Sequence, residues 1–407
     1  MKETINRSDK MIKFDFETYT KEFIDKEEYN KLLAEKEKYI EKLNKSNMVG
    51  WMREIDKETV VDIKETAEYI KNNFDVLVVI GIGGSYLSSS AIHSALKSYF
   101  SNDFEVIYAG STLSTKYLDE LLNYLKNKNF CLNVISKSGK TLETSIVYKL
   151  LKDLLKRKYN IEEMSKHIIA TTTKGSGLLW EEAQVEGYKT FEIPNDVGGR
   201  YSFITPAHLL PLALNYDIDK IIDGYFDGKR LIDDAYKYAL TRNLLFKSKK
   251  YIENFCVYEE NLLQFTEWLK QLFGESEGKN NQGIFPVASL YTRDLHSLGQ
   301  FIQEGNKIIF ETVIKILNSN HYIQYNNYSL DELNKNISEA VSIAHYKGKV
   351  PIIEIEMDEL TLENISELAY FFQLSAAFSG YLFNVNPFDQ PGVELYKNEI
   401  KNLLNKG

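Results

Sequence analysis

The feature that most constrains the fold is a repeated alternation of short apolar runs with helical patterns. The run at residues 75–80, Asp-Val-Leu-Val-Val-Ile, is rich in β-branched residues and ends directly in a glycine cluster at residues 81–85. Apolar runs of this length predict buried strands, and helices between them predict a parallel sheet covered on both faces. The predicted strands of this first half are residues 75–80, 104–109, 130–136, 167–172 and 188–193.

The same alternation returns in the second half of the chain. Residues 205–249 are mostly helical in pattern, and strands are then predicted at residues 251–258, 283–287, 307–316 and 350–355. Helical patterns between and after them cover residues 260–273, 292–303, 329–346, 360–383 and 392–404. We therefore predict an α/β protein with two domains, each a mainly parallel sheet flanked by helices. The predicted division is residues 1–50 as an N-terminal helical segment, 51–205 as the first domain, and 206–407 as the second domain with its C-terminal helix.

Composition narrows the class of protein. A chain of 407 residues has room for two or three domains, and its net charge of −9 argues against general nucleic-acid binding but not against a small anionic substrate. Two cysteines, Cys131 and Cys256, are too few for a disulfide framework and suit a reducing compartment.

The sequence carries no clear targeting or membrane signal. Residues 1–20 lack the apolar core of a signal peptide, and the uncharged stretch at 368–388 is interrupted by polar residues. We expect a cytoplasmic protein without a membrane span.

Two glycine- and hydroxyl-containing turns are candidate anion sites. Residues 81–85 follow a strand and precede a helix, where free backbone N–H groups attract anions. Residues 136–141, Ser-Lys-Ser-Gly-Lys-Thr, follow another strand and offer three hydroxyls. Both would lie at the carboxyl ends of strands, where open α/β sheets bind ligands. The dinucleotide fingerprint fails at Tyr86 and the nucleotide phosphate loop fails at Val134. For each turn alone, a tight or capped turn without a ligand is the alternative.

Three further motifs carry charged or amide side chains. Arg200 follows two glycines, so its guanidinium can approach an anion, although alone this sequence favours a surface turn. Gln271 and Glu275 are four residues apart and share one helix face, where Glu275 is a candidate general base. Gln390 and Lys397 are seven apart, which predicts one face of the final helix. A solvated helix end is the alternative for both pairs.

Together and in this order, these motifs resemble the glucose-6-phosphate isomerase family, in its shorter bacterial form. The resemblance spans residues 76–404, and its most specific pieces are residues 81–85, 197–202, 273–279 and 388–397. It implies two sugar-isomerase (SIS-type) domains, a homodimer, no metal and no redox cofactor. It also implies an aldose–ketose isomerase, an intramolecular oxidoreductase that interconverts glucose 6-phosphate and fructose 6-phosphate through a cis-enediol in glycolysis and gluconeogenesis.

The resemblance assigns a role to each matching residue. Glu275 matches the base that moves a proton between the first two carbons, and Arg200 matches the residue that stabilises the enediolate. His296 and Lys397 match the groups that open the sugar ring, with the histidine supplied by the partner subunit. Two amides, Gln271 and Gln390, match substrate contacts. The phosphate and substrate cradle matches Gly84, Ser85, Ser136, Lys137, Ser138 and Thr141.

Other functions remain open at this point. A broader isomerase would also act on mannose 6-phosphate, and a sugar-phosphate-binding protein would keep the cradle without catalysis. A nucleotide-dependent kinase or oxidoreductase is disfavoured because both glycine patterns depart from their templates. The remaining histidines, among them His208 and His345, are expected to be structural.

Overall fold

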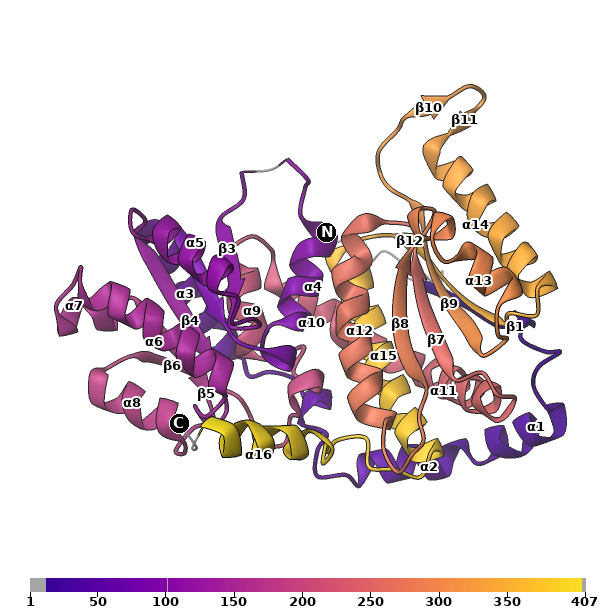
Figure 1. Ribbon diagram of the computed structural model, residues 1–407, viewed down its shortest axis with the longest axis horizontal. Helices are drawn as coiled ribbons and strands as arrows, with labels where there is room; N and C mark the ends of the chain where they lie inside the picture. The colour runs from indigo at the N-terminus through magenta and orange to yellow at the C-terminus, as the bar shows by residue number, and fades with distance from the viewer. Residues whose placement is uncertain (1–11, 101, 405–407) are drawn as a thin grey trace, which may run out of the picture. The chain divides into compact units, whose positions relative to one another are not determined.

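The structure is a computed structural model that describes residues 12–100 and 102–404 (Figure 1). The chain divides into two compact units. The first unit contains Ser46–Phe226, and the second contains Asp227–Gly407 together with the segment up to Lys45. This division groups the N-terminal segment with the second sheet, and it ends the first unit about 20 residues later than the sequence suggested.

A five-stranded parallel sheet forms the centre of the first unit, in the order β3-β2-β4-β5-β6. Each predicted strand of this half is confirmed, and β2, which lies between β3 and β4 in the sheet, is buried at every position. That burial explains its unbroken Val–Leu–Val–Val–Ile sequence. The bounds are β2 Val76–Ile80, β3 Glu105–Ala109, β4 Phe130–Ile135, β5 Ile168–Thr172 and β6 Lys189–Glu192.

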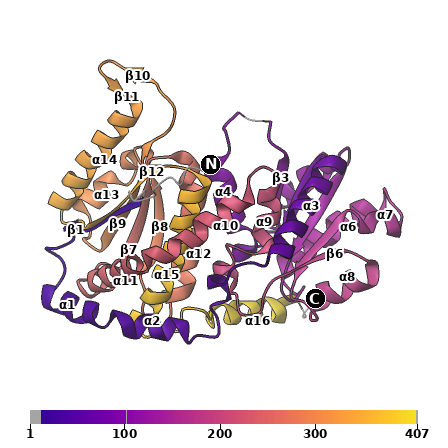
Figure 2. The ribbon, with the colours of Figure 1, turned by 180° about the vertical axis from the view of Figure 1, so that it is seen from behind.

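Helices cover both faces of this sheet. One face packs against α5–α8, where Val147, Leu151 and Leu155 of α6 recur every four residues and are buried. The opposite face carries α3, α4 and α9, of which α9 contacts both of the others (Figure 2). Asp56 caps α3 by accepting a hydrogen bond from the Thr59 N–H at 2.7 Å. The bounds are α3 Lys57–Asn73, α4 Leu87–Leu96, α5 Thr115–Leu125, α6 Leu142–Lys156, α7 Ile161–Ser165, α8 Leu178–Glu186, α9 Pro206–Ala213 and α10 Ile218–Asp227.

The second unit contains a five-stranded sheet in the order β1-β12-β9-β7-β8. All neighbours are parallel except β1, which pairs antiparallel with β12 at the edge. The N-terminal segment was predicted to be helical, but its residues 12–19 form this strand. Ile12 and Phe16 are buried, while Lys13 and Glu17 are exposed. The bounds are β1 Ile12–Tyr19, β7 Ile252–Val257, β8 Phe285–Leu290, β9 Ile309–Asn318 and β12 Ile352–Glu359.

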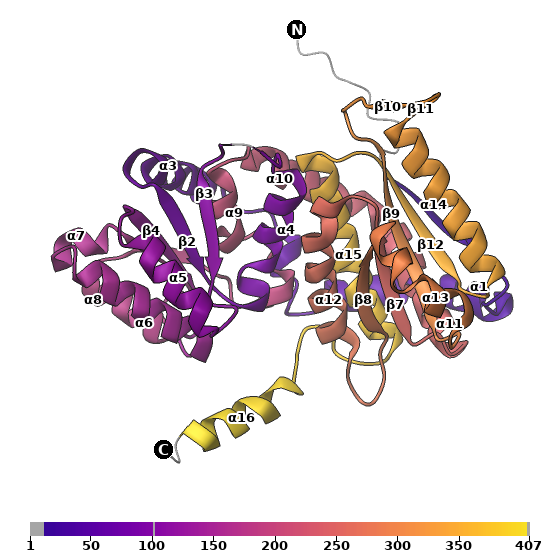
Figure 3. The ribbon, with the colours of Figure 1, turned by 45° about the horizontal axis from the view of Figure 1, so that its top comes forward.

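Helices also flank the second sheet on both sides. On one face α11, α12 and α15 pack around the rings of Phe255, Phe273 and Phe372. On the other face lie α13 and α14, and Figure 3 shows α14 along its length. The bounds are α1 Lys26–Ala34, α2 Lys36–Asn44, α11 Ile232–Lys247, α12 Leu263–Glu277, α13 Gly299–Glu304, α14 Leu330–Lys347, α15 Leu362–Leu382 and α16 Val393–Leu404. A short hairpin, β10 Gln324–Tyr325 and β11 Tyr328–Ser329, precedes α14.

One helix prediction for the second unit needs correction. The helix predicted at residues 292–303 is broken into a short 3-10 helix, Arg293–His296, and α13. The stretch at residues 368–388 is largely the buried helix α15, as expected. The two cysteines, Cys131 and Cys256, are both free and buried. No helix within the described part of the chain is long and apolar enough to cross a membrane. Nor do three His, Cys, Asp or Glu side chains of those residues gather where they could hold a metal ion.

Candidate active site

The predicted site residues fall into two groups, one in each unit. In the first unit, the 3-10 helix Gly83–Ser85 follows β2 and packs on a second 3-10 helix, Gly199–Tyr201. A Cβ on Gly84 would lie 2.2 Å from the carbonyl carbon of Gly199. Because real side chains never approach a backbone so closely, only glycine fits here. The close approach brings Gly84 and Ser85 beside the segment that carries Arg200.

A buried histidine holds this contact together. His208 Nε2 lies 2.9 Å from the carbonyl oxygen of Gly84, and its Nδ1 accepts a hydrogen bond from the Ser89 N–H at 3.2 Å. Ser202 Oγ donates to the same Gly84 oxygen at 3.1 Å. Burial lowers the pKa of His208 to about 4, so the imidazole is neutral with its proton on Nε2. The histidine is structural, as expected. It also supports Gly84, a predicted site residue, and nothing in the sequence indicated this contact.

The second predicted turn follows β4, next to β2 in the sheet. Ser136 is buried, and its Oγ accepts a hydrogen bond from the Gly139 N–H at 3.0 Å. Ser138 is exposed, and its Oγ accepts from the Lys140 N–H at 3.3 Å. Thr141 is the N-cap residue of α6, but its side chain makes no capping hydrogen bond. The turn thus presents three hydroxyls around the first turn of a helix.

Lys137 and Arg200 supply the positive charge of this group. Lys137 Nζ donates to the carbonyl oxygen of Val197 at 2.5 Å and so ties the β4 turn to the loop that carries Arg200. Burial lowers the pKa of Lys137. Arg200 is 1% exposed, and its guanidinium carbon lies 5.6 Å from the centre of the Tyr201 ring. The first unit therefore brings all seven of its predicted residues onto three adjoining loops.

A cavity of about 370 Å³ adjoins this group between α6 and α8. Ser136 and Gly139 line one end of it. Its other lining residues are Val134, Thr144, Ser145, Tyr148, Lys149, Lys152, Asp153, Lys156, Leu178, Leu179 and Glu182.

In the second unit, Gln271 and Glu275 lie on the same face of α12, as predicted. Gln271 Nε2 donates to Glu275 Oε1 at 3.3 Å. Both side chains are partly buried, so this is not a fully solvated helix end. The carbonyl oxygen Gln271 Oε1 is buried and has no hydrogen-bond partner among the residues that the structure describes.

The loop that carries Gln390 is fastened to the end of α12 by Lys279. Its Nζ contacts the Asn386 carbonyl oxygen and lies 3.1 Å from Asp389 Oδ1. Sequence reasoning gave Lys279 no role, because Asn386 is 107 residues away. The predicted pairing of Gln390 with Lys397 on one helix face is wrong, since α16 begins at Val393 and Gln390 lies before it.

Two predicted residues lie apart from Glu275 within the second unit. His296 is exposed and ends the 3-10 helix beyond the carboxyl end of β8, whereas α12 ends before the amino end of β8. The six residues of β8 span about 20 Å. Lys397 lies on α16, which has no buried residue, and its Nζ pairs with Glu394 Oε1 at 2.9 Å. The structure does not bring either side chain to Glu275.

Comparison with known proteins places this arrangement in a family. The family model described as phosphoglucose isomerase matches residues 46–406. The chain belongs to the phosphoglucose isomerase family. The matched range, residues 46–406, includes both groups of predicted site residues. Among curated relatives, the glucose-6-phosphate isomerase of Staphylococcus epidermidis is 43% identical, with 89% of this chain and 88% of that protein covered. The glucose-6-phosphate isomerase of Bacillus anthracis is 42% identical, with 89% and 87% covered.

Several solved structures have folds similar to that of this chain. A Thermus thermophilus protein described as hypothetical protein TT0462 superposes with a TM-score of 0.85 at 27% identity, over 97% of this chain and 99% of that one. A glucose-6-phosphate isomerase from Chlamydia trachomatis has a TM-score of 0.77 at 22% identity, over 88% and 77%. Tagatose-6-phosphate ketose/aldose isomerase from Escherichia coli has a TM-score of 0.54 at 13% identity, over 92% and 95%. The last two show the shared sugar-isomerase fold alone.

Proposed function

We propose that this protein reversibly interconverts glucose 6-phosphate and fructose 6-phosphate, and that Glu275 moves a proton between the first two carbons through a cis-enediol. The observation that carries the proposal is the family match over residues 46–406. Aldose–ketose isomerisation needs one base that removes the acidic proton beside a carbonyl and returns it to the adjacent carbon. A single carboxylate can serve both carbons if the planar intermediate is held still.

The second unit supports the role of Glu275 through its neighbours. The amide of Gln271 holds one carboxylate oxygen at 3.3 Å, which restricts the rotamers of the base. The buried Gln271 Oε1 has no hydrogen-bond partner among the described residues, and we assign it to a sugar hydroxyl. Gln390, on the loop held by Lys279, is the second proposed substrate amide.

The first unit offers a site for the phosphate and a cation for the intermediate. We assign phosphate and substrate binding to Gly84, Ser85 and residues 136–138 with Thr141, because hydroxyls beside the start of a helix suit a phosphate monoester. Binding the phosphate orients the distant reacting carbons. Arg200 is assigned to the enediolate oxyanion, since a buried guanidinium stabilises developing negative charge without reorganising.

Ring opening is assigned to His296 and Lys397, with His296 supplied by the partner subunit of a homodimer. In support, His296 and Glu275 lie beyond opposite ends of β8 within one chain. A two-fold dimer would exchange the same surface between both copies and so complete two equal sites.

The proposed route needs neither a metal nor a redox cofactor, because the hydrogen moves as a proton. Interconversion of these two sugar phosphates belongs to glycolysis and gluconeogenesis, so we propose a cytoplasmic enzyme.

A dehydrogenase-coupled assay tests the proposed reaction. With a metal chelator present, the protein should convert fructose 6-phosphate to glucose 6-phosphate, and the reverse reaction should run in a matching assay. Mannose 6-phosphate, assayed alongside, separates a bifunctional isomerase from one that acts on glucose and fructose phosphates only. Binding of fructose 6-phosphate without turnover would contradict the proposal and favour a sugar-phosphate-binding protein.

A further inference from the structure

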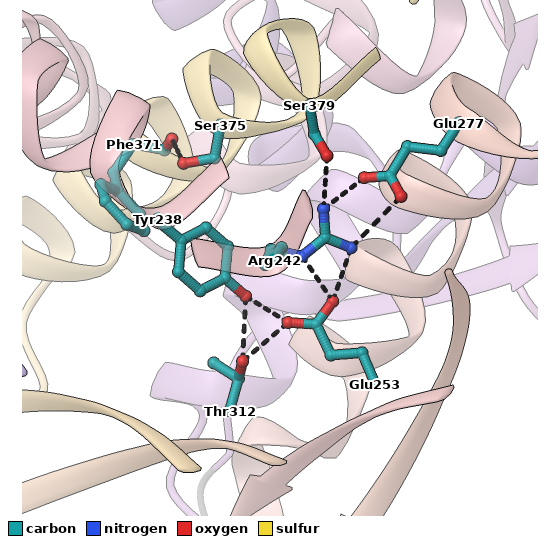
Figure 4. A network of polar contacts seen from close by, with 8 residues as sticks. All are labelled: Tyr238, Arg242, Glu253, Glu277, Thr312, Phe371, Ser375 and Ser379. Atoms are coloured by element: carbon teal, nitrogen blue, oxygen red, sulfur yellow. Dashed lines mark hydrogen bonds and ion pairs between the residues drawn. The ribbon is translucent and has the colours of Figure 1, made fainter. Parts of the chain in front are cut away.

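A fully buried ion cluster lies beneath the last turn of α12 (Figure 4). Its centre is Arg242 of α11, which is 0% exposed. The guanidinium donates to Glu253 Oε2 of β7 at 2.8 Å, and to Ser379 Oγ of α15 at 2.8 Å. It also pairs with both carboxylate oxygens of Glu277, the last residue of α12. One side chain thus links four elements of the second unit.

The cluster holds α12 on both sides of Glu275. Glu277 follows Glu275 by two residues, and its carboxylate forms an ion pair with Arg242. Phe273 precedes Glu275 by two residues, and the Arg242 guanidinium carbon lies 4.1 Å from the centre of its ring. An ion pair and a cation–π contact therefore act on the same helical turn.

Further hydrogen bonds fix the cluster from below. Glu253 Oε1 accepts from Tyr238 OH at 2.5 Å and from Thr312 Oγ1 at 2.7 Å. These donors satisfy the second oxygen of Glu253, whose other oxygen pairs with Arg242. Because each member is bonded and excluded from water, the network has little freedom to move.

The cluster is costly if stability is its only purpose. It buries one cation with two carboxylates, and buried ion pairs are often no more stabilising than apolar residues of similar size. Burial raises the pKa of Glu277, and Arg242 only partly opposes that shift.

We propose that Arg242 and Glu277 are positioning residues that hold the last turn of α12 so that Glu275 keeps a fixed place over the reacting carbons. This inference rests on the proposed role of Glu275 as the base. A base that serves two adjacent carbons tolerates little displacement, because a misplacement of about 1 Å can cost roughly a hundredfold in rate. The anchors act through the helix and do not touch the substrate.

The test compares Glu277→Ala with Glu277→Gln. Alanine releases the helix end and leaves Arg242 balanced against Glu253, so the protein is expected to fold. We expect kcat to fall about 10- to 100-fold while KM changes less than about threefold. Glutamine keeps an oxygen that accepts from Arg242, so it should restore kcat to within about threefold of the parent.

A matched control lies elsewhere in the same unit. Glu354 of β12 accepts hydrogen bonds from Lys315 Nζ at 2.6 Å and from Ser342 Oγ at 2.8 Å, and its side chain is 13% exposed. Glu354→Ala removes a largely buried charged acceptor that is not on α12. It should lower the urea midpoint and leave kcat within about twofold.

A second readout is independent of how much enzyme is folded. With substrate deuterated at the second carbon, the ratio of label transferred to the first carbon to label lost to water reports how well the base is held. Glu277→Ala should lower this ratio, and Glu277→Gln and Glu354→Ala should not.

The outcomes separate the positioning role from the proposed function. Suppose that the parent isomerises and Glu275→Gln does not. If Glu277→Ala then keeps the parent ratio and kcat, the positioning role is overturned and the role of Glu275 stands. If the parent itself fails to isomerise, the proposed function fails first. If Glu277→Ala does not fold, Ser379→Ala, which removes one acceptor of Arg242, should lower the ratio, and an unchanged ratio there also overturns the inference.

Discussion

At the scale of single residues, the first unit depends on a histidine that must stay neutral. His208 Nδ1 accepts a hydrogen bond and Nε2 donates one, so a second proton would break the contact to Ser89. Its pKa of about 4 lies below the ordinary 6.5, so the unfolded chain binds a proton more readily. Stability should therefore fall as the pH drops from about 6.5 to about 4, by on the order of 3 kcal/mol from this group.

Replacing this histidine should flatten that dependence. His208→Gln is expected to be about 1–3 kcal/mol less stable near neutral pH, because buried partners lose hydrogen bonds. It should also lose less stability than the parent between pH 6.5 and 4. Urea unfolding at a series of pH values measures both effects. His321→Gln, at an exposed position, is the control and should follow the parent curve. Equal slopes for His208→Gln and the parent would refute the assignment.

At the scale of elements, the contact between the two 3-10 helices of the first unit requires glycine at one position. Gly84→Ala would place a methyl group 2.2 Å from backbone atoms of Gly199, so the segment that carries Arg200 must shift. We expect a loss of about 1–3 kcal/mol in stability together with a lower kcat. Gly198→Ala meets its nearest atom at 3.7 Å and should change stability by less than about 1 kcal/mol. Thermal unfolding and the coupled assay of both variants decide the matter, and equal effects would contradict the tight-contact account.

The N-terminal strand offers a second prediction at this scale. Ile12 is 0% exposed where β1 pairs with β12, so Ile12→Ala should destabilise the second unit by about 2–5 kcal/mol. Lys13→Ala, on the exposed face of the same strand, should cost less than about 1 kcal/mol. Similar urea midpoints for the two variants would show that β1 does not pack as described.

How much the sequence could predict depended on how local the signal was. β2 was predictable because every residue of it is buried and apolar. The alternation of Ile12, Phe14 and Phe16 with charged residues also marked a strand, but the surrounding Lys- and Glu-rich composition favoured a helix. Arg242 could not be recognised, because its partners lie 11, 35 and 137 residues away along the chain.

At the scale of the whole molecule, the central expectation is a dimer that shares its sites. If His296 acts on the partner's sugar, Glu275→Gln and His296→Ala are each inactive as pure dimers. Mixed dimers would contain one intact site and one doubly altered site. Unfolding the two variants together and refolding them should restore about a quarter of the parent activity by statistical pairing. Refolding each variant alone is the control. No recovery in mixtures that do form mixed dimers would place both residues in one chain.

The most direct test of the account follows the hydrogen itself. Glucose 6-phosphate deuterated at the second carbon should give fructose 6-phosphate with part of the label at the first carbon and part lost to water, as followed by NMR. Glu275→Gln should neither transfer nor exchange the label, yet still bind the sugar phosphate. Glu267→Gln, on the same helix, removes a carboxylate whose side chain is 44% exposed and should behave like the parent. Label transfer by Glu275→Gln at near the parent rate would contradict the claim that this carboxylate carries the proton.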